Sequence, residues 1–323
     1  MTVAVGIIGA LVLVVAYLVT IKEAIRERLG SWLAQKPVRI WLLPCSVLAY
    51  YTVVASASGQ WSAVALGALA IYLGVPTMLA YLTGPKSDEA MSGRDLAINF
   101  CVLLWIWLPI EVDVVPVKWL HVSIGSGTPR LYPLGIYAVV IYSLIVLTSW
   151  RRFDMHCDLS LKKEYLVPIV TTFEVLSVLL LLLTLPSGLV QAGMANFTKL
   201  NVIGLPSEVA VPLTVIFGVP AVLFGLTFAE ELIFRGGIQN LLEQRLHPLL
   251  ALLIASVVFG LAHINNTAFG LAFPNWPYVG LATLAGLGYG YVFLKTQSVM
   301  ASATVHAMIG VVSKLFFRSG GCS

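Results

Sequence analysis

The sequence predicts an all-α fold, a polytopic integral membrane bundle of helices. Of its 323 residues, 59% are hydrophobic and 11% are charged, whereas soluble domains usually contain about 25% charged residues. The mean hydropathy is +0.93. Roughly ten apolar stretches approach or reach the ~17–25 residues that a helix needs to cross the hydrocarbon core. The expected spans are residues 2–20, 40–57, 61–83, 96–112, 133–150, 167–185, 209–232, 247–264, 277–294 and 298–317.

The distribution of basic residues indicates an orientation for these spans. The first span has no basic residue ahead of it and no A-x-A pattern, and Lys22, Arg26 and Arg28 follow it. This pattern is typical of an uncleaved anchor whose N-terminus lies outside the cytoplasm. Alternating the loops from there places most of the 19 Lys and Arg residues on the cytoplasmic side. We therefore expect a multi-pass protein of a bacterial inner (plasma) membrane.

Charge and cysteine content narrow the range of partners. The net charge of +4 is small, and in a membrane protein it reports loop topology, so no nucleic-acid partner is expected. The four cysteines have no C-x-x-C spacing, which argues against a disulfide framework or a zinc cluster. The expected organisation is an N-terminal region of about six helices, a core and a short tail. These divisions are residues 1–208, 209–317 and 318–323.

Three charges interrupt a long apolar tract at Phe228-Ala-Glu-Glu-Leu-Ile-Phe-Arg235. A charge at bilayer depth costs about 2.5–3.5 kcal/mol on insertion scales, so these side chains are expected to face protein or water and not lipid. On a helix, Glu231 and Arg235 share a face, while Glu230 points about 100° away. Glu230 is thus a candidate general base. A purely structural Glu231–Arg235 pair between helices is the alternative.

Two histidines downstream can reach this segment. His247-Pro248 predicts a turn, and Glu230 and His263 lie at equal sequence distances from it. In an antiparallel hairpin the carboxylate and the imidazole would then face each other at one depth. His306 lies within the last apolar span. The helix before it carries Gly286 and Gly290, whose spacing would allow close helix packing and so bring the hairpin and the last helix together.

These residues carry a family resemblance. The motifs are Glu230-Glu231-x-x-x-Arg235, Phe259-x-x-x-His263, and His306 preceded by Thr296-Gln-Ser298. Together they resemble the three motifs of the CAAX prenyl protease and bacteriocin-processing (CPBP, Abi) family of intramembrane proteases. The resemblance implies a glutamic-type peptidase whose active site lies within the C-terminal helices. It further implies that Glu230 and His263 activate water, that Glu231 and Arg235 support the helix, and that His306 stabilises the oxyanion.

One position departs from the family pattern. The third motif usually has a polar residue four positions after its histidine, and here that position is Gly310. Loss of one oxyanion donor typically costs about 10²–10³ in rate. Asn265 and Asn266, which follow His263, are candidate substitutes.

The sequence therefore predicts an intramembrane endopeptidase without a cofactor, which hydrolyses a peptide bond of a membrane-associated substrate. That substrate would be a tagged, leader-bearing or lipidated protein, and the sequence specifies neither its identity nor an oligomeric state. One alternative is a zinc hydrolase with Zn²⁺ held by Glu230, His263 and His306, although the H-E-x-x-H spacing is absent. A second is a transporter or scaffold with a buried charge relay, which Glu174 within residues 167–185 would also fit.

Overall fold

The computed structural model is all-α apart from one pair of three-residue strands, as predicted. The chain divides into two compact units, Met1–Asp158 and Leu159–Ser323. The expected boundary at 208/209 falls outside the described residues and stays a prediction. The structure describes residues 8, 11–12, 15–57, 59, 61–85, 91–111, 140–187, 189–192, 223, 227–266, 270–271 and 273–319.

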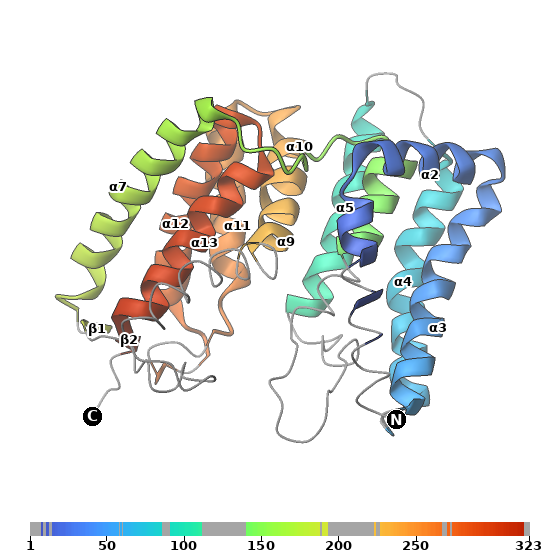
Figure 1. The fold of residues 1–323 in the computed structure, drawn as a ribbon, viewed down its shortest axis with the longest axis horizontal. Coiled ribbons are helices and arrows are strands. Elements are labelled where there is room, and N and C mark those ends of the chain that lie inside the picture. Colours follow the sequence, from blue (N-terminus) through green and yellow to red (C-terminus); the bar gives the residue numbers. More distant parts are fainter. Residues whose placement is uncertain are drawn as a thin grey trace. The chain divides into compact units, whose positions relative to one another are not determined.

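Local signals explain the ends of helices in the N-terminal unit (Figure 1). Ser62 accepts a hydrogen bond from Ala65 N as an N-cap, and Gly84 ends the same helix with φ +70°. Ser92 and Asp95 form a reciprocal capping box at the next helix, with N···O distances of 3.2 and 3.3 Å. The elements of this unit are α2 (Glu23–Gln35), the 3-10 helix η1 (Pro37–Trp41), α3 (Leu42–Ala57), α4 (Ala63–Thr83), α5 (Gly93–Glu111) and the π-helix η3 (Leu144–Trp150).

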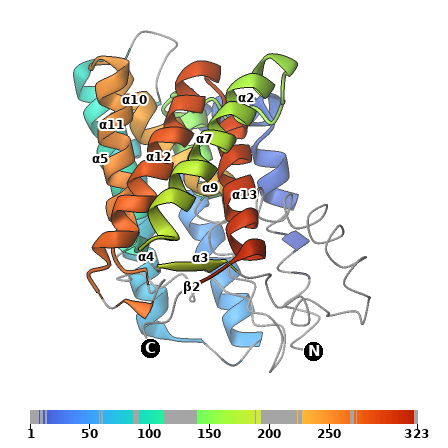
Figure 2. The same cartoon turned by 90° about the vertical axis from the view of Figure 1, so that its left-hand side faces the viewer.

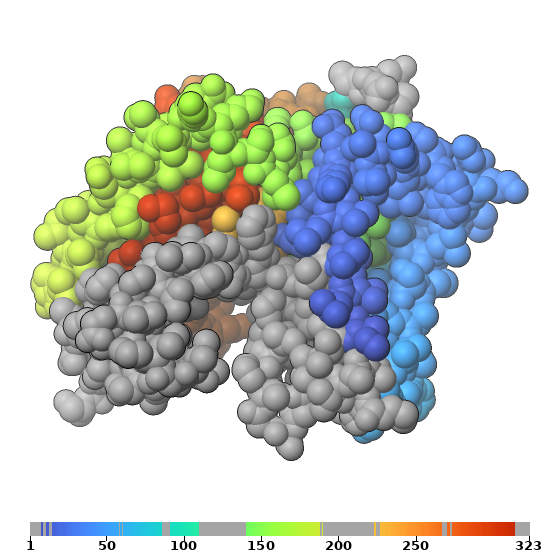
Figure 3. Space-filling model, viewed as in Figure 1, coloured from blue at the N-terminus to red at the C-terminus, as the bar shows by residue number. Residues whose placement is uncertain are grey.

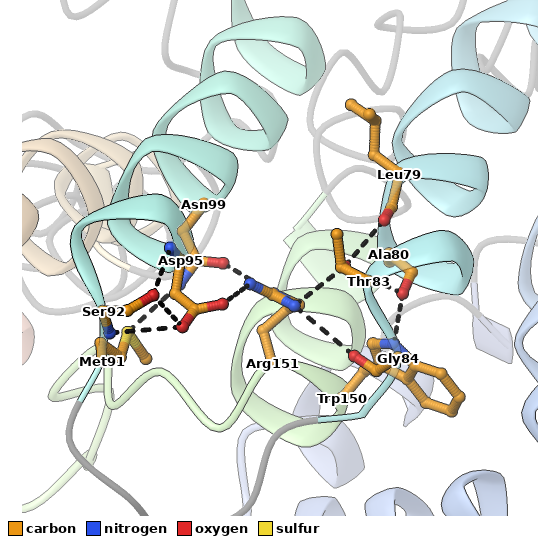
Figure 4. Close-up of polar contacts among 10 residues, drawn as sticks. All are labelled: Leu79, Ala80, Thr83, Gly84, Met91, Ser92, Asp95, Asn99, Trp150 and Arg151. Carbon is orange, nitrogen blue, oxygen red and sulfur yellow. Dashed lines mark hydrogen bonds and ion pairs between the residues drawn. The ribbon is translucent and has the colours of Figure 1, made fainter.

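A fully buried arginine joins three of these helices. Arg151, which follows η3, donates to Asp95 Oδ1, Asn99 Oδ1 and Thr83 Oγ1, each at 2.9 Å (Figure 4). The Asp95 carboxylate also accepts from Ser92 Oγ at 2.6 Å. The Arg151 side chain is 0% exposed. Its charge is therefore neutralised inside the unit and stabilises the packing of α4, α5 and η3.

We expect Arg151→Met to lower the free energy of unfolding by about 3 kcal/mol, because it leaves the Asp95 carboxylate buried without its cation. Arg152→Met is the matched control, since Arg152 is exposed and should change stability by less than about 0.5 kcal/mol. Unfolding by SDS titration in mixed micelles measures both. Equal losses in the two variants would contradict a role for the buried network.

The C-terminal unit is a bundle in which α7 packs against both α12 and α13 (Figure 2). In Figure 3 the residues of α7, in yellow-green, lie on the surface of this unit, and many of the apolar side chains of α7 are exposed. Its elements are the 3-10 helix η4 (Lys163–Tyr165), α7 (Leu166–Thr184), β1 (Val190–Ala192), α9 (Phe228–Glu231), the π-helix η7 (Leu232–Gln239), α10 (Asn240–Glu243), α11 (Pro248–Ala262), α12 (Trp276–Thr296), α13 (Val299–Phe316) and β2 (Phe317–Ser319). β1 and β2 pair antiparallel.

The turn predicted at His247-Pro248 is present. His247 caps α11 by accepting from Leu249 N, and Pro248 occupies the first turn of that helix. The segment α9–η7–α10 therefore ends just before α11 begins, and the two pack against each other. The expected hairpin between the glutamate helix and the helix of Phe259 is correct.

Glycines allow α12 to approach its neighbours, as the spacing of Gly286 and Gly290 predicted. A Cβ on Gly290 would lie 2.6 Å from Gln239 Oε1, and one on Gly286 would lie 3.1 Å from the Phe259 ring. On the facing helix α11, a Cβ on Gly260 would collide with Thr283 Oγ1 and lie 2.7 Å from a backbone carbonyl. The backbones of α11 and α12 are thus too close for any side chain at Gly260.

Gly260→Ala should destabilise the protein by about 1–3 kcal/mol, because the added methyl overpacks a backbone contact that cannot move aside. A Cβ on Gly280 would meet nothing within 4 Å, so Gly280→Ala should be neutral or stabilise by up to about 1 kcal/mol. Thermal unfolding in detergent compares the two variants. A Gly260→Ala variant as stable as Gly280→Ala would show that the helices can separate at no cost.

Four described helices are long and apolar enough to cross a membrane: Pro37–Ala57, Ala63–Thr83, Lys163–Thr184 and Trp276–Thr296. Shorter apolar helices cover Val140–Trp150, Pro248–Ala262 and Val299–Ser313. The chain is therefore a multi-pass membrane protein, while the expected total of ten stays a prediction, because residues 2–20, 133–150 and 209–232 lie partly outside the described ranges. Glu174, which the sequence analysis considered for a buried charge relay, lies exposed on α7.

Candidate active site

The centre of the site is the buried ion pair between Glu231 and Arg235. Both side chains are 0% exposed, and Arg235 Nε lies 3.0 Å from Glu231 Oε2 across one turn, from α9 into η7. The guanidinium carbon of Arg235 lies 5.0 Å from the centroid of the Phe259 ring, a favourable cation–π distance. Neither Nη atom has a hydrogen-bond partner within the part of the chain that the structure describes. The carboxylate and the ring are therefore the groups that stabilise this cation.

Two side chains of α13 reach the same carboxylate. Ser302 Oγ donates to Glu231 Oε2 at 2.7 Å, and His306 Nδ1 lies 2.9 Å from Glu231 Oε1. Thr227, at the start of the glutamate helix, adds a 3.2 Å contact from its hydroxyl to the carbonyl of Ala303. Glu231 thus holds the last helix against the glutamate helix through both of its oxygens.

Glu230 differs from its neighbour in exposure and in partners. Its side chain is 26% exposed, and its Oε2 lies 3.7 Å from His306 Nε2. The two ring nitrogens of His306 therefore point to two different carboxylates, Nδ1 to the buried one and Nε2 to the accessible one. Because Arg235 pairs with Glu231, Glu230 is the accessible carboxylate of the cluster, as the helical spacing predicted.

His263 lies in the same cluster but is not paired with Glu230. Its Nδ1 is 2.8 Å from the Phe259 carbonyl, and its ring packs on the Phe259 ring with a centroid distance of 4.7 Å. Among the described residues, the ion pairs of the two glutamates are with Arg235 and His306. The turn brings α11 beside the glutamate helix, as the equal sequence distances predicted. However, α11 ends at Ala262, and His263 is its C-cap. The His263 side chain therefore does not lie within 4.0 Å of the Glu230 carboxylate.

Three aromatic rings form the wall of the site. Phe259 packs edge-on against the His306 ring at 5.7 Å, and Tyr289 stacks on that ring at 4.4 Å with an interplanar angle of 16°. The Tyr278 ring lies 5.7 Å from that of His263. The sequence analysis noted Phe259 but missed both tyrosines and Ser302. A signal existed for Ser302, which lies four residues before His306 and so shares its helical face.

The structure gives Asn266 a partner in this wall, because its side chain hydrogen-bonds Tyr278. Gly310 lies one turn beyond His306 on α13 and contributes no side-chain donor. As for a metal, the described residues contain no group of three or more His, Cys, Asp or Glu side chains arranged to hold an ion.

The two glutamates should respond differently to neutralisation. Glu231→Gln should cost about 3 kcal/mol of stability, because it leaves the buried Arg235 without its counter-ion. Glu230→Gln changes a partly exposed carboxylate and should cost less than about 0.5 kcal/mol. SDS-titration unfolding of both variants measures the difference. Similar stabilities would contradict the assignment of the structural charge to Glu231.

Comparison with known proteins places a family domain on this site. Residues 212–312, roughly the C-terminal third of the chain, match the family model described as type II CAAX prenyl endopeptidase, Rce1-like. No curated protein and no solved structure matches the chain. The matched segment includes all of the candidate residues, namely Glu230, Glu231, Arg235, His263 and His306.

Proposed function

We propose that this chain is a membrane endopeptidase of the glutamic type. The premise is that residues 212–312 form an Rce1-like domain of the type II CAAX prenyl endopeptidase family. The mechanism rests on the different environments of the two adjacent carboxylates. Glu231 is fully buried and paired with Arg235, whereas the side chain of Glu230 is 26% exposed and has His306 Nε2 at 3.7 Å. Glu230 is therefore the carboxylate available to a water molecule.

Peptide hydrolysis at this site begins with a water beside Glu230. The Glu230 carboxylate takes a proton from the water as its oxygen bonds to the carbonyl carbon of the scissile amide, which produces a tetrahedral oxyanion. The C–N bond then breaks, and the proton passes from Glu230 to the leaving nitrogen. The products are a carboxylic acid and an amine, which exchange a proton to become a carboxylate and an ammonium, and the glutamate returns to its starting state.

The histidines have complementary roles in this mechanism. Donation of Nδ1–H to Glu231 leaves His306 Nε2 on the accessible side of the cluster. When the ring carries both protons, Nε2–H is a donor for the oxyanion. Nδ1 of His263 is engaged by the Phe259 carbonyl, which leaves its Nε2 for the attacking water. No step requires a metal or a cofactor.

The substrate is proposed to be a membrane-anchored protein or peptide. The matched family is described by its action on CAAX prenyl proteins, and the apolar helices around the site fit a substrate that carries a lipid or a hydrophobic segment. A tagged or leader-bearing protein has the same physical character. We place the activity in a bacterial inner membrane, with the bilayer itself as the second partner.

Glu230→Gln should lower kcat by at least about 10²-fold, because the amide cannot accept the proton of the water. The assay uses purified protein in micelles and an internally quenched, farnesylated peptide that ends in a CAAX tetrapeptide, with the unprenylated peptide in parallel. Glu164→Gln removes an exposed carboxylate in η4, just before α7, and is the matched control. Cleavage retained in Glu230→Gln, or absent from the wild type with both peptides, would refute the proposal.

Two controls on the same protein separate the alternatives. Activity unchanged after chelation, with no stoichiometric zinc in the purified protein, is the expected result, whereas loss of activity on chelation with recovery on zinc addition would favour the zinc hydrolase. A transporter or scaffold would give no glutamate-dependent cleavage at all.

A further inference from the structure

Ser302 is a buried hydroxyl of the site that the family motifs do not include. It lies on α13, is 0% exposed, and its Oγ is 2.7 Å from Glu231 Oε2 and 2.9 Å from the Tyr289 carbonyl on α12. Four residues later, on the same helical face, His306 Nδ1 meets the other oxygen of the same carboxylate at 2.9 Å. One carboxylate thus connects the serine to the histidine.

A count of hydrogens defines what the serine does. A serine hydroxyl has one hydrogen, and a backbone carbonyl can only accept. The Glu231 carboxylate, paired with Arg235 at 3.0 Å, is also an acceptor. Ser302 therefore shares its hydrogen between two acceptors, and the charged carboxylate at 2.7 Å takes the stronger bond. The hydroxyl ties Oε2 of Glu231 to the backbone of α12.

The orientation of Glu231 decides the state of His306. With Oε2 held by Arg235 and Ser302, Oε1 is turned to Nδ1 and accepts its hydrogen. In a neutral imidazole only one nitrogen carries a proton, so Nε2, on the side of Glu230, is then the nitrogen that takes the second proton when the ring becomes the imidazolium that donates to the oxyanion. Tyr289, stacked at 4.4 Å, and Phe259, edge-on at 5.7 Å, restrict rotation of the ring.

We propose that Ser302 is a positioning residue, which holds the Glu231 carboxylate so that Nδ1 of His306 keeps its proton and Nε2 faces Glu230. Its effect on rate rests on the proposed peptidase function, whereas its effect on the imidazole does not. The carboxylate–imidazole arrangement follows the general rule that the bond made by one ring nitrogen fixes the chemistry of the other.

The first test reads the ring directly and needs no substrate. The protein is labelled with ¹⁵N-histidine, and NMR over a pH series reports the protonation of each ring nitrogen; comparison with His306→Gln assigns the signal among the five histidines. In the wild type we expect Nδ1 of His306 to be protonated throughout. In Ser302→Ala the neutral ring should become a mixture of both tautomers. An unchanged tautomer in Ser302→Ala would overturn the proposal.

The second test uses the quenched farnesylated peptide. Ser302→Ala should lower kcat about tenfold, the effect of losing one charge-assisted hydrogen bond, with little change in KM because the serine does not contact substrate. Ser302→Thr keeps the hydroxyl on the same Cβ and should restore the Nδ1 tautomer and most of the rate. Thr304→Ala is the control, since among the described residues the bond of this α13 hydroxyl is to the carbonyl of Met300 in its own helix.

The outcomes separate this inference from the proposed function. A tautomer shift without any loss of kcat would show that Ser302 positions His306 but not for catalysis, and would refute its role in the reaction. If the wild type cleaves neither peptide, the peptidase proposal fails, and the NMR result still decides whether Ser302 sets the imidazole. SDS-titration unfolding confirms that Ser302→Ala is folded before either result is interpreted.

Discussion

The structure of the C-terminal unit depends on the neutralisation of one buried carboxylate. Glu231 is inaccessible, and its oxygens contact Arg235 from the next helical turn and Ser302 and His306 from α13. A lone carboxylate in this environment would cost several kcal/mol, so the folded unit needs contacts that neutralise it. These contacts hold the glutamate helix against the last helix. They also direct the His306 ring, whose Nε2 lies 3.7 Å from Glu230 Oε2.

The two units stabilise the charge of a buried guanidinium in different ways. Arg151 is surrounded by oxygen acceptors from α4 and α5, including the carboxylate of Asp95, and its environment is that of a structural node. Arg235 has one carboxylate and the face of Phe259, and its Nη atoms have no acceptor among the described residues. Arg235 therefore relies on a carboxylate and an aromatic face, whereas Arg151 relies on several oxygen acceptors.

Close helix packing is what allows these short side chains to meet. Gly260, Gly286 and Gly290 remove the side chains that would otherwise separate α11 and α12 from each other and from the glutamate helix. The Tyr289 ring can therefore stack directly on His306, and Phe259 can contact both histidines. The turn at His247-Pro248 adds the antiparallel arrangement. Backbone proximity thus supplies a geometry that the catalytic residue types alone would not.

The features that could be predicted from the sequence are those that depend on residues close together in the sequence. Apolar stretch lengths predicted helices close to α3, α4, α7, α11, α12 and α13, because hydrocarbon thickness imposes a length. The i,i+4 spacing predicted the pairing of Glu231 with Arg235, because it is a property of a single helix. The turn at His247-Pro248 predicted that α11 lies beside the glutamate helix, since the position of the turn in a hairpin fixes which residues of its two helices lie at the same level. In each case a local rule was sufficient.

The partners of Glu230 and of His306 could be identified only from the tertiary structure. Spacing favoured His263 opposite Glu230, yet the imidazole within 4.0 Å of it is that of His306, because the rotation of a helix about its axis is set by packing and not by position in the sequence. Ser302, Tyr278 and Tyr289 enter the site for the same reason, and no motif marks them. The residue types capable of hydrolysis were therefore visible in the sequence, whereas which nitrogen faces which carboxylate followed from how three helices pack around Phe259.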